Sequence, residues 1–202
     1  MNRILKFLNI NSDDNQKYIL WSLFLKGLLI TYISPCITKA IISDLPAEWL
    51  AFESLFGSIS GLLIGILWKG NIRKTAIKSF LLFCITESLA GCFLGLYLCF
   101  INYNVWVFAI CSLLYTSFIT EFVAKCIMAF KAVLWQEKER ELYDNNISII
   151  GGIVCVIGFS LALLFMPSLK AALFIWALCC ILDDIGWLIV YQKNKKQLKN
   201  IA

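Results

Sequence analysis

Residues 57–74 read GSISGLLIGILWKGNIRK, a stretch without charge up to Trp68 that is followed at once by Lys69, Arg73 and Lys74. An apolar run that stops at a basic loop is typical of a membrane helix whose end faces the cytoplasm, because Lys and Arg are enriched in cytoplasmic loops. The same alternation of apolar runs and basic connectors continues on both sides of this stretch. It predicts an all-α integral membrane protein.

Composition supports this fold class. The chain has 202 residues, of which 60% are hydrophobic and 15% charged. Soluble domains average about 45–50% apolar and about 25% charged residues, so a soluble globular protein is excluded. One crossing of the bilayer takes about 20 apolar residues. The expected membrane helices are Ile19–Ile42, Trp49–Trp68, Ile77–Phe100, Val105–Met128, Ile147–Phe165 and Lys170–Tyr191.

These helices predict a single six-helix transmembrane domain over residues 1–202, with an N-terminal segment at 1–18 and a basic tail at 192–202. The mixed-charge connector 135–145 is expected to extend the fourth helix. Basic residues concentrate on one side of the expected membrane, whereas only Lys39 and Lys170 lie on the other. The positive-inside rule therefore predicts a multi-pass plasma (inner) membrane protein with both termini in the cytoplasm.

Several function classes are disfavoured. The chain has no histidine, which is the commonest general base and a frequent zinc ligand, so an enzyme is not expected. Nine cysteines lie almost wholly in apolar runs without metal-ligand spacing, and they are interpreted as small apolar residues rather than as a metal or cofactor site. The net charge of +5 follows from the basic loops and predicts no nucleic-acid partner.

The stretch at 57–74 resembles the second helix and the following loop of the major facilitator superfamily, whose motif is Gly-x-Leu-x-Asp-Arg-x-Gly-Arg-Lys. Gly65, Leu67, Arg73 and Lys74 match the motif, whereas Lys69 stands in place of its Asp. Residues 183–186, Asp-Asp-Ile-Gly, resemble an Asp-x-x-Gly pattern in the sixth helix of the drug-efflux branch, which includes macrolide exporters.

The chain also departs from that family. Tyr115 stands where the fourth helix often carries an arginine, and residues 150–158 lack the Gly-Pro pair of the antiporters. The chain has six expected helices, whereas the family has twelve. The resemblance therefore implies one half of such a transporter, the N-terminal one, built from two three-helix inverted repeats.

Charges inside the expected spans are the candidate functional residues, because each costs about 2.5–3.5 kcal/mol at the centre of the bilayer. Five residues qualify and are expected to form a polar transport layer. They are Lys26, Glu87, Glu121, Asp183 and Asp184. The resemblance implies that Lys26 and Glu121 face a cavity and that Glu87 lies near Asp183. The alternative is that Lys26 extends to the membrane interface and that Glu121 pairs with Lys125 on its own helix.

Glycines at 57, 61 and 65 leave one face of the second helix without side chains, so another helix backbone can approach it closely. Gly57, Gly61 and Gly65 either pack within the chain or contact a second six-helix unit, because the second helix lines the interface between halves in the resembled fold. Besides the lipid bilayer, the expected partners are thus a second copy or another half, and an unidentified small molecule.

Two classes of function follow. The first is a half-size carrier that dimerises, or pairs with another half, and exports a small amphiphilic compound. The second is a degenerate accessory, immunity or regulatory membrane protein without transport activity. An intramembrane enzyme is a weaker alternative, because Asp183 and Asp184 are neighbours that point about 100° apart and do not converge as a protease pair does.

Overall fold

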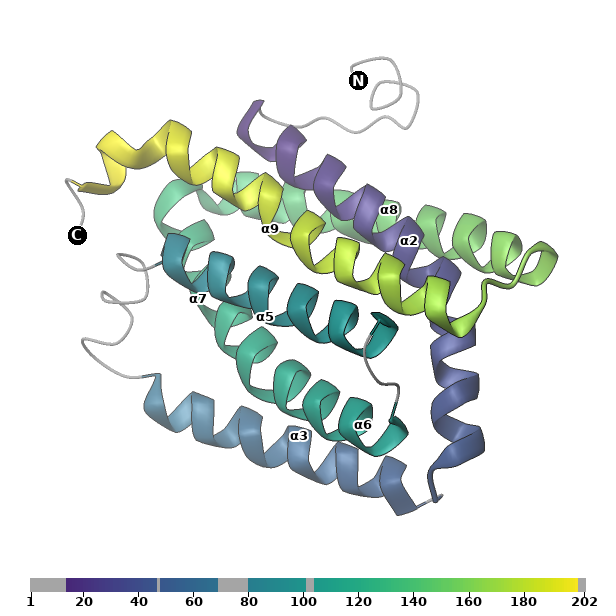
Figure 1. The fold of residues 1–202 in the computed structure, drawn as a ribbon. Helices are drawn as coiled ribbons and strands as arrows, with labels where there is room; N and C mark the ends of the chain where they lie inside the picture. The colour runs from purple at the N-terminus through teal and green to yellow at the C-terminus, as the bar shows by residue number, and fades with distance from the viewer. Residues whose placement is uncertain (1–13, 47, 69–79, 101–103, 200–202) are drawn as a thin grey trace.

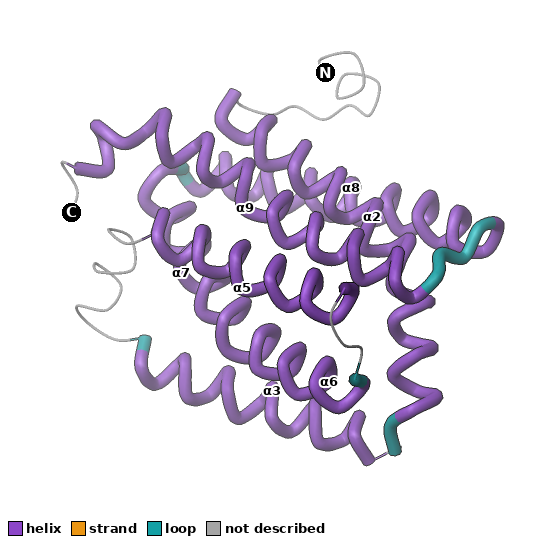
Figure 2. Tube along the Cα trace, viewed as in Figure 1, coloured by secondary structure: helices purple, strands orange, loops and turns teal. Residues whose placement is uncertain are grey.

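The computed structural model describes residues 14–46, 48–68, 80–100 and 104–199, and nearly all of these residues are helical (Figures 1 and 2). The helices are α2 (Asp14–Asp44), α3 (Glu48–Leu67), α5 (Phe80–Phe100), α6 (Val105–Leu114), the π-helical η1 (Tyr115–Thr120), α7 (Glu121–Leu134), α8 (Glu137–Leu164) and α9 (Leu169–Lys199). Because α6, η1 and α7 follow one another without a break, the described chain forms six rods. The all-α prediction is confirmed.

Five segments of these rods are long and apolar enough to cross a bilayer. They are Gln16–Asp44, Phe80–Phe100, Val105–Leu134, Glu137–Leu164 and Leu169–Lys195. The apolar part of α3, Ala51–Leu67, is shorter, so five of the six expected spans have the length and composition to cross a bilayer and the sixth corresponds to a shorter apolar helix. The chain has the helices of a multi-pass membrane protein.

Two expected helix ends and the expected continuation of one helix are wrong. α2 begins at Asp14 and α9 continues to Lys199, so polar residues expected outside the helices prolong them. The 135–145 connector does not extend the fourth helix, because Trp135 has an extended backbone (φ −120°, ψ 141°) that ends α7. α8 starts instead at Glu137, where Gln136 and Glu139 form a reciprocal capping box that satisfies the first amides of the helix.

α9 occupies the centre of the packing, between α2 and α5 (Figure 1). The start of α2 and the end of α9 lie at the same end of the molecule, because the Lys193 ammonium is 4.1 Å from the ring centroid of Tyr18. We call this the terminal end and the opposite one the distal end. α8 packs along the other side of α2, where the Thr31 hydroxyl donates a hydrogen bond to the Val154 carbonyl (3.0 Å).

Glycines allow these helices to approach closely. A Cβ atom on Gly186 of α9 would lie 2.7 Å from the Cα atom of Ile19, and one on Gly95 of α5 would lie 2.8 Å from the Cβ atom of Ala177. A Cβ atom on Gly158 of α8 would overlap Thr31 of α2. Since the first of these obstacles is backbone, α2 and α9 cannot keep their separation if Gly186 gains a side chain.

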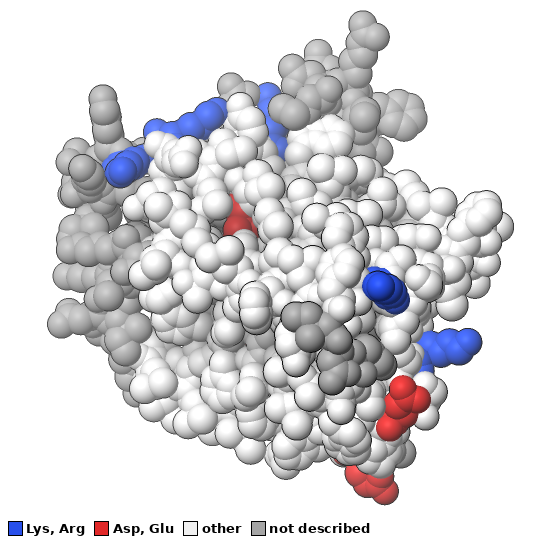
Figure 3. Space-filling model, in the orientation of Figure 1, with Lys and Arg blue, Asp and Glu red and all other residues white. Residues whose placement is uncertain are grey.

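Aromatic side chains from α5, α7 and α9 pack against one another at the terminal end. Phe80 of α5 stacks on Phe130 of α7 with ring centroids 4.4 Å apart, and Trp187 of α9 contacts both rings edge-on. Trp187 is only 3% exposed, so it packs inside the bundle. On the face that Figure 3 shows, the surface between the two ends is uncharged apart from one acidic patch, and basic side chains lie at both the terminal and the distal end. This distribution matches the apolar belt of a membrane protein.

α3 lies at the periphery. It contacts the α6–η1–α7 rod through aromatic pairs such as Phe56 with Phe118 (centroids 5.5 Å apart), while Leu55, Leu62 and Ile66 are more than half exposed. Its remaining apolar face is uncovered by the described part of the chain.

We predict that Gly186→Ala lowers the free energy of unfolding by about 1–3 kcal/mol, because the new methyl group meets backbone atoms of α2. Gly152→Ala on α8 is the matched control. A Cβ atom there meets no described atom within 4 Å, so the substitution leaves stability unchanged or raises it by up to about 1 kcal/mol through helix propensity. Unfolding of both variants in detergent measures the difference, and equal stability would contradict this packing.

Candidate functional site

A cluster of polar side chains lies buried where α5, α7 and α9 meet. Ser88 of α5 donates a hydrogen bond of 2.7 Å to Oδ2 of Asp184 in α9, and the Cys84 thiol also hydrogen-bonds Asp184. Glu87 is close enough to Cys84 and to Cys126 of α7 to act on both electrostatically. We call Cys84, Glu87, Ser88, Cys126 and Asp184 the buried acidic cluster.

The sequence places these residues together through a repeat of small side chains. Cys84, Ser88, Gly91 and Gly95 are spaced four, three and four residues apart, so they occupy one face of α5. The facing side of α9 presents Ala177, Cys180 and Asp184 with similar spacing. Small residues let two helix backbones approach closely in a membrane. The close seam brings Ser88 within hydrogen-bonding distance of Asp184.

Burial makes this cluster energetically significant. Asp184 is 1% exposed and Glu87 is 3% exposed. A carboxylate at such a position has lost its hydration, and it persists in the structure only with hydrogen bonds or with a proton of its own. The cluster therefore provides two carboxyl groups, a hydroxyl and thiols that can hold or pass a proton in an apolar seam. The described residues contain no group of three or more metal-ligating side chains placed to hold a metal ion.

The π-helical turn η1 borders this seam at Gly91. Tyr115, its first residue, places its hydroxyl oxygen 2.8 Å from where a Cβ atom on Gly91 would be, and its ring meets Trp176 of α9 edge-on at 5.9 Å. A π turn inserts one residue into a helix and is frequent at functional sites. Tyr115, where the resembled family often has an arginine, thus extends the seam toward the distal end.

The five charged residues predicted to form a polar layer have different surroundings in the structure. Asp184 and Glu87 belong to the buried acidic cluster, and Asp184 has the interhelical hydrogen bond that one of two adjacent aspartates was expected to need. Lys26 and Glu121 are both half-buried, and their pairing stays a prediction. The side chain of Asp183 lies outside the described residues, so its expected proximity to Glu87 also stays a prediction.

The loop motif and the glycine face of α3 lie away from the cluster. Leu67 ends α3 and is 62% exposed, Gly65 is exposed, and Arg73 and Lys74 fall outside the described residues. A Cβ atom on Gly57 would be 3.9 Å from the Ser117 hydroxyl oxygen, an ordinary contact. Cβ atoms on Gly61 and Gly65 would meet no described atom within 4 Å. Of this glycine face, only Gly57 borders another described helix.

Sequence reasoning missed Cys84, Ser88 and Cys126 as members of the site. The search for intramembrane charge does not find neutral hydroxyls and thiols. The spacing of small residues from Cys84 to Gly95 is a usable signal, because it marks the face of α5 that a second helix approaches.

Comparison of the chain with protein-family models, with curated proteins and with solved structures finds no match.

We predict that Ser88→Ala lowers the free energy of unfolding by about 1–3 kcal/mol, because it leaves a buried oxygen of Asp184 without its hydroxyl donor. Ser160→Ala on α8 is the matched control, since its exposed hydroxyl bonds only the Val156 carbonyl of its own helix. Unfolding in detergent compares the two. If Ser88→Ala and Ser160→Ala both have the same free energy of unfolding as the parent chain, the Ser88–Asp184 hydrogen bond does not stabilise the seam.

Proposed function

We propose that this chain is a half-size, major-facilitator-like carrier that exports a small amphiphilic compound, as a dimer or together with a second six-helix unit. The observation that carries the proposal is the burial of Glu87 and Asp184 between helices of an otherwise apolar bundle. Ionisable groups inside a membrane are costly, and they mark proton, ion or substrate pathways in transporters. The proposal includes a plasma-membrane location with both termini in the cytoplasm, in accord with the basic terminal end.

The pattern of helix contacts supports an internal repeat. Consider α2, α3 and α5 as one set, and the α6–η1–α7 rod, α8 and α9 as the other. α2 packs on α8 as α3 packs on the α6–η1–α7 rod, and α2 packs on α9 as α5 packs on that rod. If α2 is exchanged with the α6–η1–α7 rod, α3 with α8 and α5 with α9, each of these contacts becomes another contact that the structure contains. Two three-helix inverted repeats produce such a pattern.

The uncovered face of α3 supports a second unit. Cβ atoms on Gly61 and Gly65 would meet nothing within 4 Å in the described part of the chain, and Leu62 beside them is 64% exposed. In the resembled fold this helix lines the interface between the halves. A second six-helix unit placed there would close a substrate cavity that one unit leaves open, as alternating access requires.

The buried acidic cluster is the proposed coupling site. Asp184 and Ser88 belong to α9 and α5, which come from opposite repeats, so their hydrogen bond spans the seam along which the repeats meet. Binding or release of a proton by the carboxyl group changes the hydrogen bonds it can accept. Proton exchange at Asp184 would thus alter the contact between the repeats.

The second candidate is an accessory or regulatory membrane protein without transport activity. The observation that favours it is the engagement of Asp184 by both Ser88 and Cys84 inside a tightly packed seam, which also suits a purely structural clamp. Loss of the arginine at Tyr115 agrees with this alternative.

Oligomeric mass tests the second unit. We expect a dimer in nanodiscs, and we expect Gly61→Leu to convert at least half of it to monomer, because the new side chain separates the two α3 faces. Gly152→Leu on α8 is the control, since a Cβ atom there also meets no described atom within 4 Å. Dissociation by both variants, or by neither, would contradict an interface on α3.

Export of a fluorescent amphiphile from cells tests transport. Asp184→Asn keeps an oxygen that accepts from Ser88 but cannot exchange a proton, so we expect at least a tenfold loss of export at unchanged protein level. Glu141→Gln, at an exposed position of α8 outside the buried acidic cluster and the glycine face of α3, is the control and should export normally. No export by the parent chain would favour the accessory protein, whereas full export by Asp184→Asn would contradict the coupling role of this carboxyl group.

A further inference from the structure

A layer of aromatic rings separates the buried acidic cluster from the terminal end. On each of three helices, one residue of this layer lies one turn from a residue of the cluster. The pairs are Phe80 and Cys84 on α5, Phe130 and Cys126 on α7, and Trp187 and Asp184 on α9. Residues three or four apart in a helix are neighbours on one face. The three rings therefore lie next to the cluster, on its terminal side.

The rings close this side of the cluster. Phe80 stacks on Phe130 with centroids 4.4 Å apart, Trp187 meets both rings edge-on, and all three side chains are buried. Tyr191, one turn farther along α9, stacks on both phenylalanine rings at 6.0 Å. Such close packing leaves no space for a water molecule. The aromatic layer thus separates the cluster from water at the terminal end.

The path from the cluster along the helices is shorter toward the terminal end. α7 ends at Leu134, one turn beyond Phe130, so the aromatic layer lies about 6 Å from the end of this helix at about 1.5 Å per residue. Toward the distal end, α5 continues from Ser88 to Phe100, a length of about 18 Å. Gly95 packs tightly against α9 along this length. Opening the aromatic layer is therefore the shorter way for water to reach the cluster.

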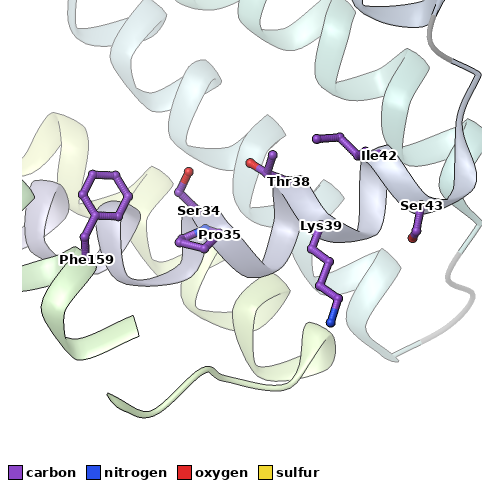
Figure 4. Close-up of a pocket in the computed structure, with 7 residues that line it drawn as sticks. All are labelled: Ser34, Pro35, Thr38, Lys39, Ile42, Ser43 and Phe159. Atoms are coloured by element: carbon purple, nitrogen blue, oxygen red, sulfur yellow. The ribbon is translucent and has the colours of Figure 1, made fainter. Parts of the chain in front are cut away.

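A groove at the distal end does not provide a second way. It lies where Pro35 interrupts the hydrogen bonds of α2, and it is lined by six residues of α2 and by Phe159 of α8 (Figure 4). None of these lining residues, all within the described part of the chain, belongs to α5, α7 or α9. The groove therefore does not open onto the buried acidic cluster.

The aromatic layer borders a break between two helices. Trp135, which follows α7, has an extended backbone (φ −120°, ψ 141°), and its ring lies 6.0 Å from the ring of Trp187. A residue at the end of a helix can absorb the change in backbone angles that a hinge motion requires. A tilt of α7 about Trp135 would move Phe130 away from Phe80 and open the layer.

Two buried polar atoms at this end lack a partner while the layer is closed. The indole N–H of Trp135 and the side-chain oxygen of Gln16 form no hydrogen bond with any described residue, although both residues are buried. Gln16 lies beside the start of α8, because its amide donates to the Glu139 carbonyl (3.0 Å). Buried polar groups are normally paired with protein or with ordered water. Water that enters when α7 tilts would satisfy both atoms.

We propose that Phe80, Phe130 and Trp187 form a gate that admits water, and protons with it, to the buried acidic cluster from the terminal end. The gate is closed in the conformation described here. Its role rests on the proposed carrier function, because the proton that it admits is the one that Asp184 would exchange. Access of a small reagent to the cluster does not require transport, so the gate and the carrier function can be tested separately.

Thiol labelling of the full chain in nanodiscs measures access, because Cys84 and Cys126 are the thiols of the cluster itself. The probe is a methanethiosulfonate with a trimethylammonium group, which dissolves in water and not in lipid, and peptide mass spectrometry gives the labelling rate of each cysteine. Phe130→Ala should speed labelling of Cys84 and Cys126 about tenfold or more, because loss of the ring leaves a cavity in the layer. Phe130→Leu fills part of this cavity and should speed labelling less.

Phe108→Ala is the matched control. Phe108 is a buried ring near the distal end that packs on Trp176 of α9 with centroids 6.2 Å apart, and Cys99 belongs to the same buried cluster. Phe108→Ala should therefore speed labelling of Cys99 and leave Cys84 unchanged, whereas Phe130→Ala should do the reverse. If Phe130→Ala speeds labelling of Cys99 as well, the variant is unfolded and the Phe130→Leu variant decides.

Equal acceleration of Cys84 labelling by substitutions at Phe130 and at Phe108 would overturn the gate, and so would no acceleration by either substitution at Phe130. If substitution at Phe130 alone exposes Cys84 while the parent chain exports nothing, the gate stands and the carrier function fails.

Discussion

The close approach of α9 to both α2 and α5 is the constraint on which the rest of the fold depends. Lipid tails are as apolar as the helix faces, so hydrophobic burial contributes little to association inside a bilayer. Close packing and interhelical hydrogen bonds have to supply the stability. Gly186 lets α2 approach one side of α9, and Gly91 and Gly95 let α5 approach the other. Larger residues at these positions would force the three helices apart.

The buried acidic cluster is a consequence of the same constraint. A seam of small residues brings the Ser88 hydroxyl within 2.7 Å of the Asp184 carboxyl, and the same seam keeps Asp184 buried. Packing and polarity therefore support each other, because the hydrogen bond fixes the register of two helices that the glycines bring together. A change in the charge of Asp184 would act on the contact that holds the bundle together.

Hydropathy was enough to predict the six helical rods, since each long apolar run becomes a helix. It could not predict that α2 begins at Asp14 or that α9 reaches Lys199, because polar residues outside a bilayer carry no hydropathy signal. The break at Trp135 was missed because only the capping box reveals it. The charge criterion found Asp184 and Glu87, whereas the neutral Ser88 depends on which faces meet, and that is a property of the assembled fold.

The glycines of α3 and α5 show the same limit of prediction from the sequence. Gly61 and Gly91 both belong to spacings that permit close packing, yet Gly91 is covered by α9 and Gly61 by no described residue. Glycine in a helix costs about 1 kcal/mol relative to alanine. Along α5 that cost is offset by contact with a second backbone. The uncovered glycines of α3 have no such offset within the described chain, and a second six-helix unit packed on α3 would supply it.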